Sequence, residues 1–251
     1  MLSIVITTYN SDNTCVTHVR EAKAAGADEI IVINDGGDPS IKDRLSGVVY
    51  ARIEQDIAWN YTGARNLGIW LSRGDFVSVE DVDNIPTKYA YKDALHYFSR
   101  HPEVGRVLYG PRHDLPVEHV NLPANKWVFT GRRGRHTDTA MFRRDALLQL
   151  KGFNELMAGR YGWSRTETSR RFNAIGIKTE CITAPFISVR GGGTDLCKCA
   201  NDGIDGFCPT CKKLIWRKSG INYNLANDAT KGRIKQSAHG ILNFTYQYEQ
   251  L

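Results

Sequence analysis

Long apolar runs are missing from this sequence of 251 residues, and so is a basic segment at its start. A membrane-spanning helix needs about 18 or more consecutive apolar residues, so the sequence predicts none. The chain begins on the strand-like residues 2–6, which is not typical of a signal peptide. From these two absences we expect a cytoplasmic protein.

Acidic residues are scarce in the second half of the chain. Residues 1–129 carry 13 Lys and Arg against 17 Asp and Glu, a net charge of −4. Residues 130–251 carry 20 against 10, a net charge of +10. We therefore expect the second half to attract anions such as nucleotide phosphates, anionic glycans, acidic lipid headgroups or nucleic acid. A surface that only keeps the protein in solution would show the same imbalance.

Cysteine is rare outside one short stretch. Two of the six cysteines, Cys15 and Cys181, stand alone. The other four form two close pairs separated by eight residues, Cys197 with Cys199 and Cys208 with Cys211. Two such pairs can bind one tetrahedral Zn²⁺ through four thiolates, in a closed site that folds a segment too small to bury its own core. Two disulfides are the alternative, which a reducing compartment disfavours.

Strands and helices are predicted to alternate at short spacing. Apolar, β-branched runs predict strands at residues 2–8, 29–33, 48–51 and 75–80, with helices at about 12–25, 60–72 and 86–100. After a basic loop at 131–135, we expect a strand and a helix over 139–152, a helix over 164–175 and a strand over 177–183. This alternation predicts an α/β fold with a mostly parallel central sheet.

Polar residues follow the predicted strands where a ligand would bind in such a fold, beyond the carboxyl ends. Asp81 and Asp83 are the clearest case, because both come directly after a buried strand. Carboxylate oxygens suit Mn²⁺ or Mg²⁺, which bind through one or two carboxylates and substrate phosphates. By itself Asp-x-Asp is a weak signal, since surface turns often contain it.

Seven short motifs follow one another along the chain. They are Ile-Val-Ile-Thr-Thr-Tyr-Asn at 4–10, Ile-Val-Ile-Asn-Asp-Gly-Gly at 31–37, Gly-Ala-Arg-Asn-Leu-Gly at 63–68, the Asp-x-Asp strand at 74–86, Phe-Arg-Arg-Asp at 142–145, Gly-Phe-Asn-Glu at 152–155 and Gly-Trp at 162–163. In this order they resemble the motifs of family-two glycosyltransferases, over roughly residues 1–190. The resemblance implies a Rossmann-like GT-A domain at 1–190, with a nucleotide-sugar-binding half at 1–129 and an acceptor half at 130–190. Residues 191–251 would then be a small C-terminal zinc-binding appendage with a basic tail.

The resemblance also implies roles for individual residues. The implied donor-binding residues are Thr8, Tyr9, Asp35, Arg65, Asn66, Asp81 and Arg190. Asp35 would bind the uracil or ribose of a UDP-sugar, and Asp81 and Asp83 would hold the donor ribose and a Mn²⁺ or Mg²⁺ ion. Without the resemblance, Asp35 would be interpreted as a turn residue before two glycines. Arg65 would be interpreted as a charged residue on the surface of a helix.

Two motifs depart from the family pattern. Alignment on Trp163 puts Glu167 at the position of the catalytic aspartate, the base that removes the proton of the acceptor hydroxyl. The alternative for Glu167 is an exposed helix residue paired with Arg170 or Arg171. Trp163 would stack on the acceptor, or else be a core aromatic residue.

The second departure is a missing histidine. Relatives often supply a metal ligand after the last core strand, where residues 187–193 of this chain contain no histidine. Arg190 would contact the diphosphate there, and His136 or His239 would complete the metal site. Weaker dependence on the metal is the consequence that we expect.

The sequence does not decide whether the acceptor is DNA or a glycan. A zinc site beside basic residues and Trp216 is typical of nucleic-acid binding, and some viral relatives modify hydroxymethylated pyrimidines in DNA. The compartment would then be the host cytoplasm. The alternative function is a non-catalytic module that binds nucleotide-sugar or nucleic acid. A nucleotidyltransferase is disfavoured, because no Gly-rich loop follows the first strand.

Overall fold

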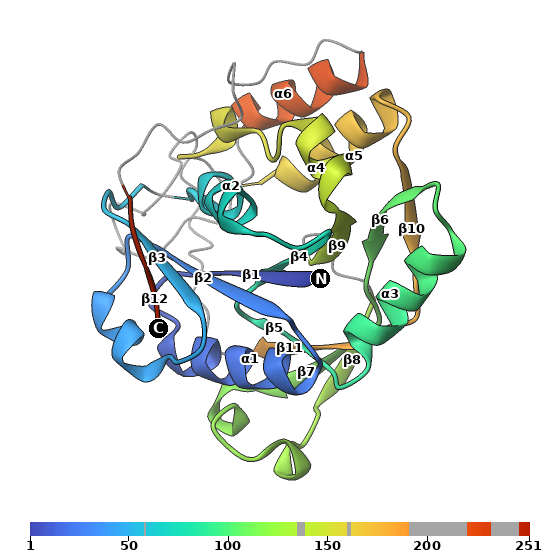
Figure 1. The fold of residues 1–251 in the computed structure, drawn as a ribbon. Helices are drawn as coiled ribbons and strands as arrows, with labels where there is room; N and C mark the ends of the chain where they lie inside the picture. The colour runs from blue at the N-terminus through green and yellow to red at the C-terminus, as the bar shows by residue number, and fades with distance from the viewer. Residues whose placement is uncertain (58, 135–138, 160–161, 191–219, 232–245) are drawn as a thin grey trace.

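A computed structural model of the chain describes residues 1–57, 59–134, 139–159, 162–190, 220–231 and 246–251. Its main sheet has eight strands in the order β10-β6-β9-β4-β1-β2-β3-β12 (Figure 1). Their bounds are β1 Leu2–Thr8, β2 Glu29–Asp35, β3 Val49–Ile53, β4 Phe76–Asp81, β6 Val104–Leu108, β9 Ala140–Arg143, β10 Lys178–Cys181 and β12 Tyr246–Gln250. The four strands β4-β1-β2-β3 run parallel, whereas β9 is antiparallel to both β4 and β6. The predicted α/β fold with a mostly parallel sheet is confirmed.

Helices cover both faces of this sheet (Figure 1). On one face lie α1 (Asp12–Ala24) and α3 (Ala90–Arg100), and on the other lie α2 (Tyr61–Leu71), α4 (Arg144–Leu150) and α5 (Ser164–Ala174). Successive side chains of β1 therefore enter two different cores, with Ile4 and Ile6 in one and Val5 in the other. Burial on both faces explains why β1 and β2 are almost continuously apolar.

A second, smaller sheet has the strand order β5-β11-β7-β8. Its strands are β5 Asn84–Pro86, β7 Arg112–Pro116, β8 Gly131–Arg133 and β11 Phe186–Arg190. The predicted helix start at Pro86 is wrong, because this residue ends β5, which pairs with β11, and α3 begins at Ala90. The predicted loop at 131–135 is also wrong for residues 131–133, which pair antiparallel with β7.

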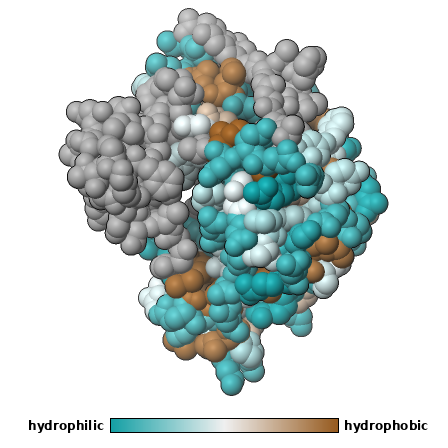
Figure 2. All heavy atoms as spheres, turned by 90° about the vertical axis from the view of Figure 1, so that its left-hand side faces the viewer, coloured by the Kyte–Doolittle hydropathy of each residue, from teal (hydrophilic) through white to brown (hydrophobic). Residues whose placement is uncertain are grey.

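Short 3₁₀ helices at Pro39–Arg44, Val117–His119, Ala124–Lys126 and Glu155–Met157 connect these elements. Two parts of the C-terminal segment contact the rest of the chain. Helix α6 (Gly220–Thr230) packs against α5, and β12 pairs antiparallel with β3 at the edge of the main sheet. Among the helices of the described residues, none is long and apolar enough to cross a membrane. Figure 2 shows one face of the molecule, on which hydrophilic residues surround separate apolar patches.

Candidate functional site

Asp81 and Asp83 lie where β4 leads into β5, at the junction of the two sheets. The Asp81 carboxylate forms an ion pair with Arg65 of α2. Asp83 is fixed through its backbone oxygen, which accepts from the Val189 amide of β11 at 2.8 Å, and its Oδ1 accepts from Asn84 at 2.8 Å. Two carboxylates in this place are hard oxygen donors of the kind that Mn²⁺ or Mg²⁺ prefers, so the residues present fit such an ion.

A buried hydrogen-bond network between α1 and β4 supports the turn that contains Asp81 and Asp83. His18 of α1 and Glu80 of β4 are both 0% exposed, and His18 Nε2 lies 2.6 Å from Glu80 Oε2. The other ring nitrogen, Nδ1, lies 3.1 Å from the backbone oxygen of Val82, the residue between the two aspartates. Tyr91 and Ser78 also donate to the Glu80 carboxylate, at 3.1 and 2.6 Å. The network therefore ties the backbone of the Asp-x-Asp turn to α1.

Arg65 extends from α2 to Asp81 and is only 2% exposed. Its guanidinium lies 5.2 Å from the ring centroids of both Tyr61 and Phe153, a distance typical of cation–π contacts. The structure thus brings Arg65 to the Asp-x-Asp turn, as a buried partner of Asp81 rather than the surface charge that was the alternative.

Polar residues at the carboxyl ends of β1, β2 and β3 come together in the fold. Asp35 Oδ1 accepts from Asn60 at 3.0 Å, and the Tyr9 hydroxyl donates to Asp56 Oδ2 at 3.2 Å. Burial raises the pKa of Asp35 to about 7, the neighbouring Asp56 acts in the same direction, and the Asn60 hydrogen bond opposes the shift. Thr8, also predicted to bind the donor, is 3% exposed.

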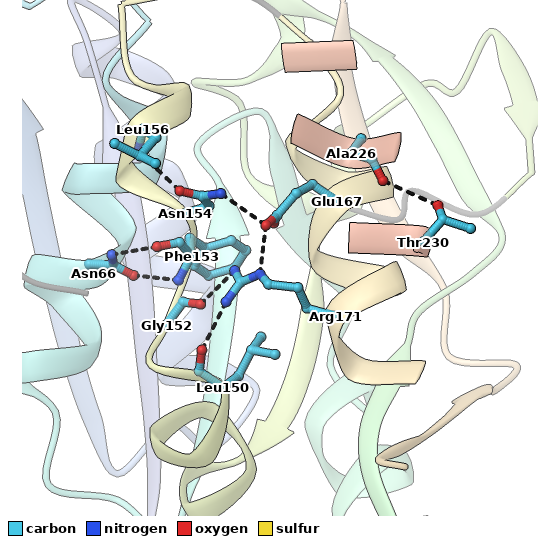
Figure 3. Close-up of polar contacts among 10 residues, drawn as sticks. All are labelled: Asn66, Leu150, Gly152, Phe153, Asn154, Leu156, Glu167, Arg171, Ala226 and Thr230. Carbon is cyan, nitrogen blue, oxygen red and sulfur yellow. Dashed lines mark hydrogen bonds and ion pairs between the residues drawn. The ribbon is translucent and has the colours of Figure 1, made fainter. Parts of the chain in front are cut away.

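Asn66 connects α2 with the loop before α5 (Figure 3). Its Oδ1 accepts from the Phe153 amide at 2.7 Å, and its Nδ2 donates to the Phe153 carbonyl at 2.9 Å and to Glu155 at 2.8 Å. The side chain therefore holds both backbone groups of Phe153 and joins α2 to the loop that follows α4. The role of Asn66 in binding the donor stays a prediction.

Glu167 lies inside the protein, where Figure 3 shows its carboxylate turned toward Asn154 and Arg171. Its side chain is 1% exposed, and Oε1 lies 2.7 Å from Arg171 Nε and 3.0 Å from Asn154 Nδ2. Burial raises the pKa of Glu167, although Arg171 and Asn154 act in the opposite direction. The sequence alternative of an exposed residue is wrong, whereas its pairing with Arg171 is confirmed. The role of Glu167 as the base stays a prediction.

Trp163 directly precedes α5 with a φ of 67°, in the left-handed region. Its ring contacts Tyr223 of α6 edge-on, with centroids 4.8 Å apart. Trp163 therefore packs against the C-terminal helix in this structure, and its stacking on an acceptor stays a prediction.

Arg190 ends β11 and forms an ion pair with Asp114 of β7, at 3.1 Å between Nε and Oδ1. The other Asp114 oxygen pairs with Arg133 at 2.7 Å. Asp114, His18 and Asp56 lie outside the motifs of the sequence, and only the fold brings them to the site. Glu80 lies within the strand motif at 74–86, but no role was predicted for it.

Several predicted ligands lie outside the described residues. These are Cys197, Cys199, Cys208, Cys211, His136 and His239. Within the described part of the chain, no group of three or more His, Cys, Asp or Glu side chains is arranged to hold a metal ion.

An open hollow of about 710 Å³ lies beside the turn after β1, lined by Asn10, Asp12, Asn13, Asp38 and Arg44. Its lining includes neither Asp81 nor Asp83. The hydrogen-bonded groups above, and not this hollow, therefore define the candidate site.

A family model described as "Glycosyl transferase family 2" matches residues 3–151, which is more than half of the chain. A search of curated proteins finds no match. Solved structures that are similar in fold include the following two. The mannosyltransferase PcManGT from Pyrobaculum calidifontis, in complex with GDP-Man and Mn²⁺, has a TM-score of 0.55 and 15% identity over 74% of this chain. S. aureus TarS 1–349, in complex with UDP-GlcNAc, has a TM-score of 0.57 and 14% identity over 76% of this chain. The chain covers 56% and 59% of these two proteins, less than two thirds of each.

Proposed function

Because the chain belongs to glycosyl transferase family 2, we propose that it transfers a sugar from a nucleotide-sugar donor to an acceptor hydroxyl. One observation carries this proposal. Asp81 and Asp83 lie at the carboxyl end of a central strand, where ligands bind in such folds, and partners from α2 and from the smaller sheet hold them there.

The donor is a UDP-sugar in this proposal, and its base and ribose lie over the turns after β1 and β2. Asp35 accepts from a nitrogen or hydroxyl of the nucleoside, beside Tyr9 and Asp56. Asp81 and Asp83 hold Mn²⁺ or Mg²⁺, which neutralises the negative charge of the leaving diphosphate when bound. Arg65 keeps Asp81 in position through their buried ion pair.

The reaction requires one bond to form and one to break. The acceptor oxygen attacks the anomeric carbon of the sugar, the bond from that carbon to the phosphate oxygen breaks, and its electron pair leaves with the nucleoside diphosphate. The hydroxyl proton passes to a base. Glu167 is the proposed base, and its raised pKa suits that role, but its carboxylate must first be exposed to the acceptor.

The transferred group is proposed to be a hexosyl residue. The two similar structures contain GDP-Man and UDP-GlcNAc, whose sugars are both hexoses, and this is the support for the choice. For the acceptor we keep hydroxymethylated DNA and glycans as the two candidates, because the net positive charge of residues 130–251 suits any anionic partner. A structural Zn²⁺ bound by the four clustered cysteines remains part of the proposal.

A transfer assay tests this function. Radiolabelled UDP-hexoses and GDP-Man are offered with Mn²⁺ to hydroxymethylated DNA and to a panel of glycans in parallel. We expect label on one acceptor class from a UDP-sugar, and loss of that transfer in Asp83→Asn. The matched control is Asp75→Asn, since Asp75 is an exposed carboxylate near the start of the same strand. Mn²⁺-dependent binding of UDP without transfer or donor hydrolysis would favour the non-catalytic module, which the burial of Glu167 also favours.

A further inference from the structure

Four charged side chains share one face of the smaller sheet. Arg112 of β7 lies directly opposite Arg133 of β8, and Asp114 follows two residues later on the same face. Arg190 reaches this face from β11, because Ser188 pairs with Asp114 and side chains alternate along a strand. The opposite face carries Leu115, Ile187 and Val189, which pack in a small core. We call Arg112, Arg133 and Arg190 the arginine group.

The charges of this group do not balance. Asp114 is its only carboxylate among the described ion pairs, and it is shared by Arg133 at 2.7 Å and Arg190 at 3.1 Å. Arg112 donates through Nε to the Gly134 carbonyl at 3.1 Å, which is a neutral partner. Burial lowers the pKa of Arg112, and Arg190 and Arg133 lower it further. Like charges placed directly opposite on neighbouring strands repel, so three arginines that share one ion-paired carboxylate, with Asp83 also near Arg112, are poised to accept another anion.

An anion from solvent can reach these side chains. Arg133 is 53% exposed and Arg190 is 36% exposed, whereas Asp114 between them is 11% exposed. A guanidinium presents a planar fork of N–H donors that matches the oxygens of a phosphate group. Arg133 and Arg190 each contact Asp114 through Nε. A ligand with several oxygens, such as phosphate, therefore suits the planar forks of these arginines better than a monatomic anion does.

The arginine group also lies next to Asp83 of the Asp-x-Asp turn, where the proposed sugar transfer takes place. Asp83 is close enough to Arg112 to raise its pKa, against the direction of burial. The backbone joins the two places as well, because the Val189 amide beside Arg190 donates to the Asp83 carbonyl at 2.8 Å. The donor nucleoside is proposed to lie across Asp83 from this group, over the main sheet. An anion bound by the arginine group would thus approach Asp83 from the side opposite to the donor nucleoside.

We propose that the arginine group binds a phosphate group of the acceptor, and that the acceptor is therefore a phosphorylated molecule. Arg190, which the resemblance implies as a contact of the donor diphosphate, is in this proposal a contact of the acceptor. This inference rests on the proposed function, and it names the chemical class of the acceptor for the same site. The proposal also assigns a specific anionic partner to Arg133, which belongs to the basic stretch at 131–135.

Two adjacent arginines provide a matched pair of variants. Arg133→Gln removes a member of the group, whereas Arg132→Gln removes the same charge from the next residue of β8, which is exposed and lies on the other face, opposite His113. Arg112→Gln is the second test variant, because no described ion pair of the fold is lost with it. Thermal unfolding is then measured with inorganic phosphate replacing chloride at constant ionic strength. We expect phosphate to raise the Tm of wild type and Arg132→Gln, and to raise it less in Arg133→Gln and Arg112→Gln.

Two further measurements identify the source of the phosphate. Titration with UDP and Mn²⁺ should give the same affinity in wild type and Arg133→Gln. The rate of transfer to sn-glycerol 3-phosphate relative to glycerol should fall roughly tenfold in Arg133→Gln, the loss expected for charged hydrogen bonds. Equal stabilisation by phosphate in all four proteins would overturn the proposal, and so would a weaker affinity of Arg133→Gln for UDP, which would assign the group to the donor diphosphate. If no sugar is transferred but the phosphate effect depends on Arg133 and Arg112, the proposed function fails and the phosphate site stands.

Discussion

Glu167 and Arg171 lie one helical turn apart in α5, and their side chains form an ion pair of 2.7 Å although each is only 1% exposed. Arg171 also donates to the carbonyl oxygens of Leu150 and Gly152, at 2.8 and 2.9 Å (Figure 3). Breaking a buried pair by removing one partner is costly, because the other charge stays buried without compensation. The pair thus stabilises the contact between α5 and the loop after α4.

Replacing Glu167 should therefore destabilise the protein. In Glu167→Gln, Arg171 keeps its charge but loses its counter-ion, and we expect the free energy of unfolding to fall by about 3–5 kcal/mol. Urea denaturation measures this loss. The control is Glu103→Gln, which removes the same charge from a solvent-exposed pair with Lys178 and should cost far less. Equal losses in the two variants would show that the buried pair is not stabilising.

A double variant separates the structural role of Glu167 from the predicted catalytic one. Replacing both charges by apolar side chains, as in Glu167→Leu with Arg171→Met, leaves no unpaired buried charge and should recover much of the stability. If Glu167 is the base, the folded double variant will bind UDP but transfer no sugar. Recovered transfer would move the base to another residue.

His18 should control the geometry of the Asp-x-Asp turn. In His18→Leu the buried Glu80 carboxylate and the Val82 carbonyl both lose a partner, so we expect a loss of about 3 kcal/mol or more in unfolding free energy. Because Val82 lies between Asp81 and Asp83, the Mn²⁺-dependent affinity for UDP should fall as well. Calorimetric titration with UDP, with and without Mn²⁺, measures this effect. His101→Leu is the control, since the His101 side chain is 42% exposed, and an unchanged Mn²⁺ dependence in His18→Leu would contradict the expected role.

The sequence was sufficient to predict the elements whose own composition determines them. Strands β1, β2 and β4 are apolar because helices cover both faces of the sheet, and that pattern is visible without any partner. Strands β8 and β12 read Gly-Arg-Arg and Tyr-Gln-Tyr-Glu-Gln, and they exist only because β7 and β3 offer an edge to pair with.

The same distinction applies to the candidate site. Asp81 and Asp83 were predictable because they directly follow a buried strand. His18 was not, because its contact with Glu80 joins residues 62 positions apart, and nothing in α1 marks a buried histidine. The burial of Glu167 was missed for a related reason. Its partner Asn154, and the Leu150 and Gly152 carbonyls that accept from Arg171, come close only through the packing of α5 on the preceding loop.

The affinity for the donor should depend on pH through Asp35. Its pKa is raised to about 7 by burial, and the ionised carboxylate accepts a stronger, charge-assisted hydrogen bond from the nucleoside than the neutral acid does. The affinity for UDP should therefore rise roughly tenfold between pH 6 and pH 8, as the ionised fraction of Asp35 increases. Titrations across this range check the prediction. Asp35→Asn is the control for ionisation of UDP itself, and a wild-type profile no steeper than that of Asp35→Asn would refute it.

The same shift has a consequence for the unliganded protein. Between about pH 4 and about pH 7 the folded protein keeps a proton on Asp35 that the unfolded chain has already released. This group therefore lowers the stability of the protein as the pH rises through that range, and its effect is complete above about pH 7. Asp35→Asn should remove this part of the pH dependence of unfolding.

Gly68 sets the distance between α2 and the main sheet. A Cβ at this position would lie 2.1 Å from Cγ1 of Val5 in β1, so Gly68→Ala must push the helix away from the strand. We expect this overpacking to cost about 1–3 kcal/mol, measured by urea denaturation, even though alanine favours helix formation by up to about 1 kcal/mol. The control is Gly134→Ala, where an added Cβ meets nothing within 4 Å.

A second substitution tests the cause of this loss. Val5→Ala removes the methyl groups that meet the new Cβ, so the double variant with Gly68→Ala should be more stable than the sum of the two single effects. Additive losses would mean that the contact with Val5 is not responsible. Because α2 also carries Arg65, whose guanidinium holds Asp81, the displaced helix in Gly68→Ala should bind UDP and Mn²⁺ more weakly, and Val5→Ala should restore that affinity together with the stability.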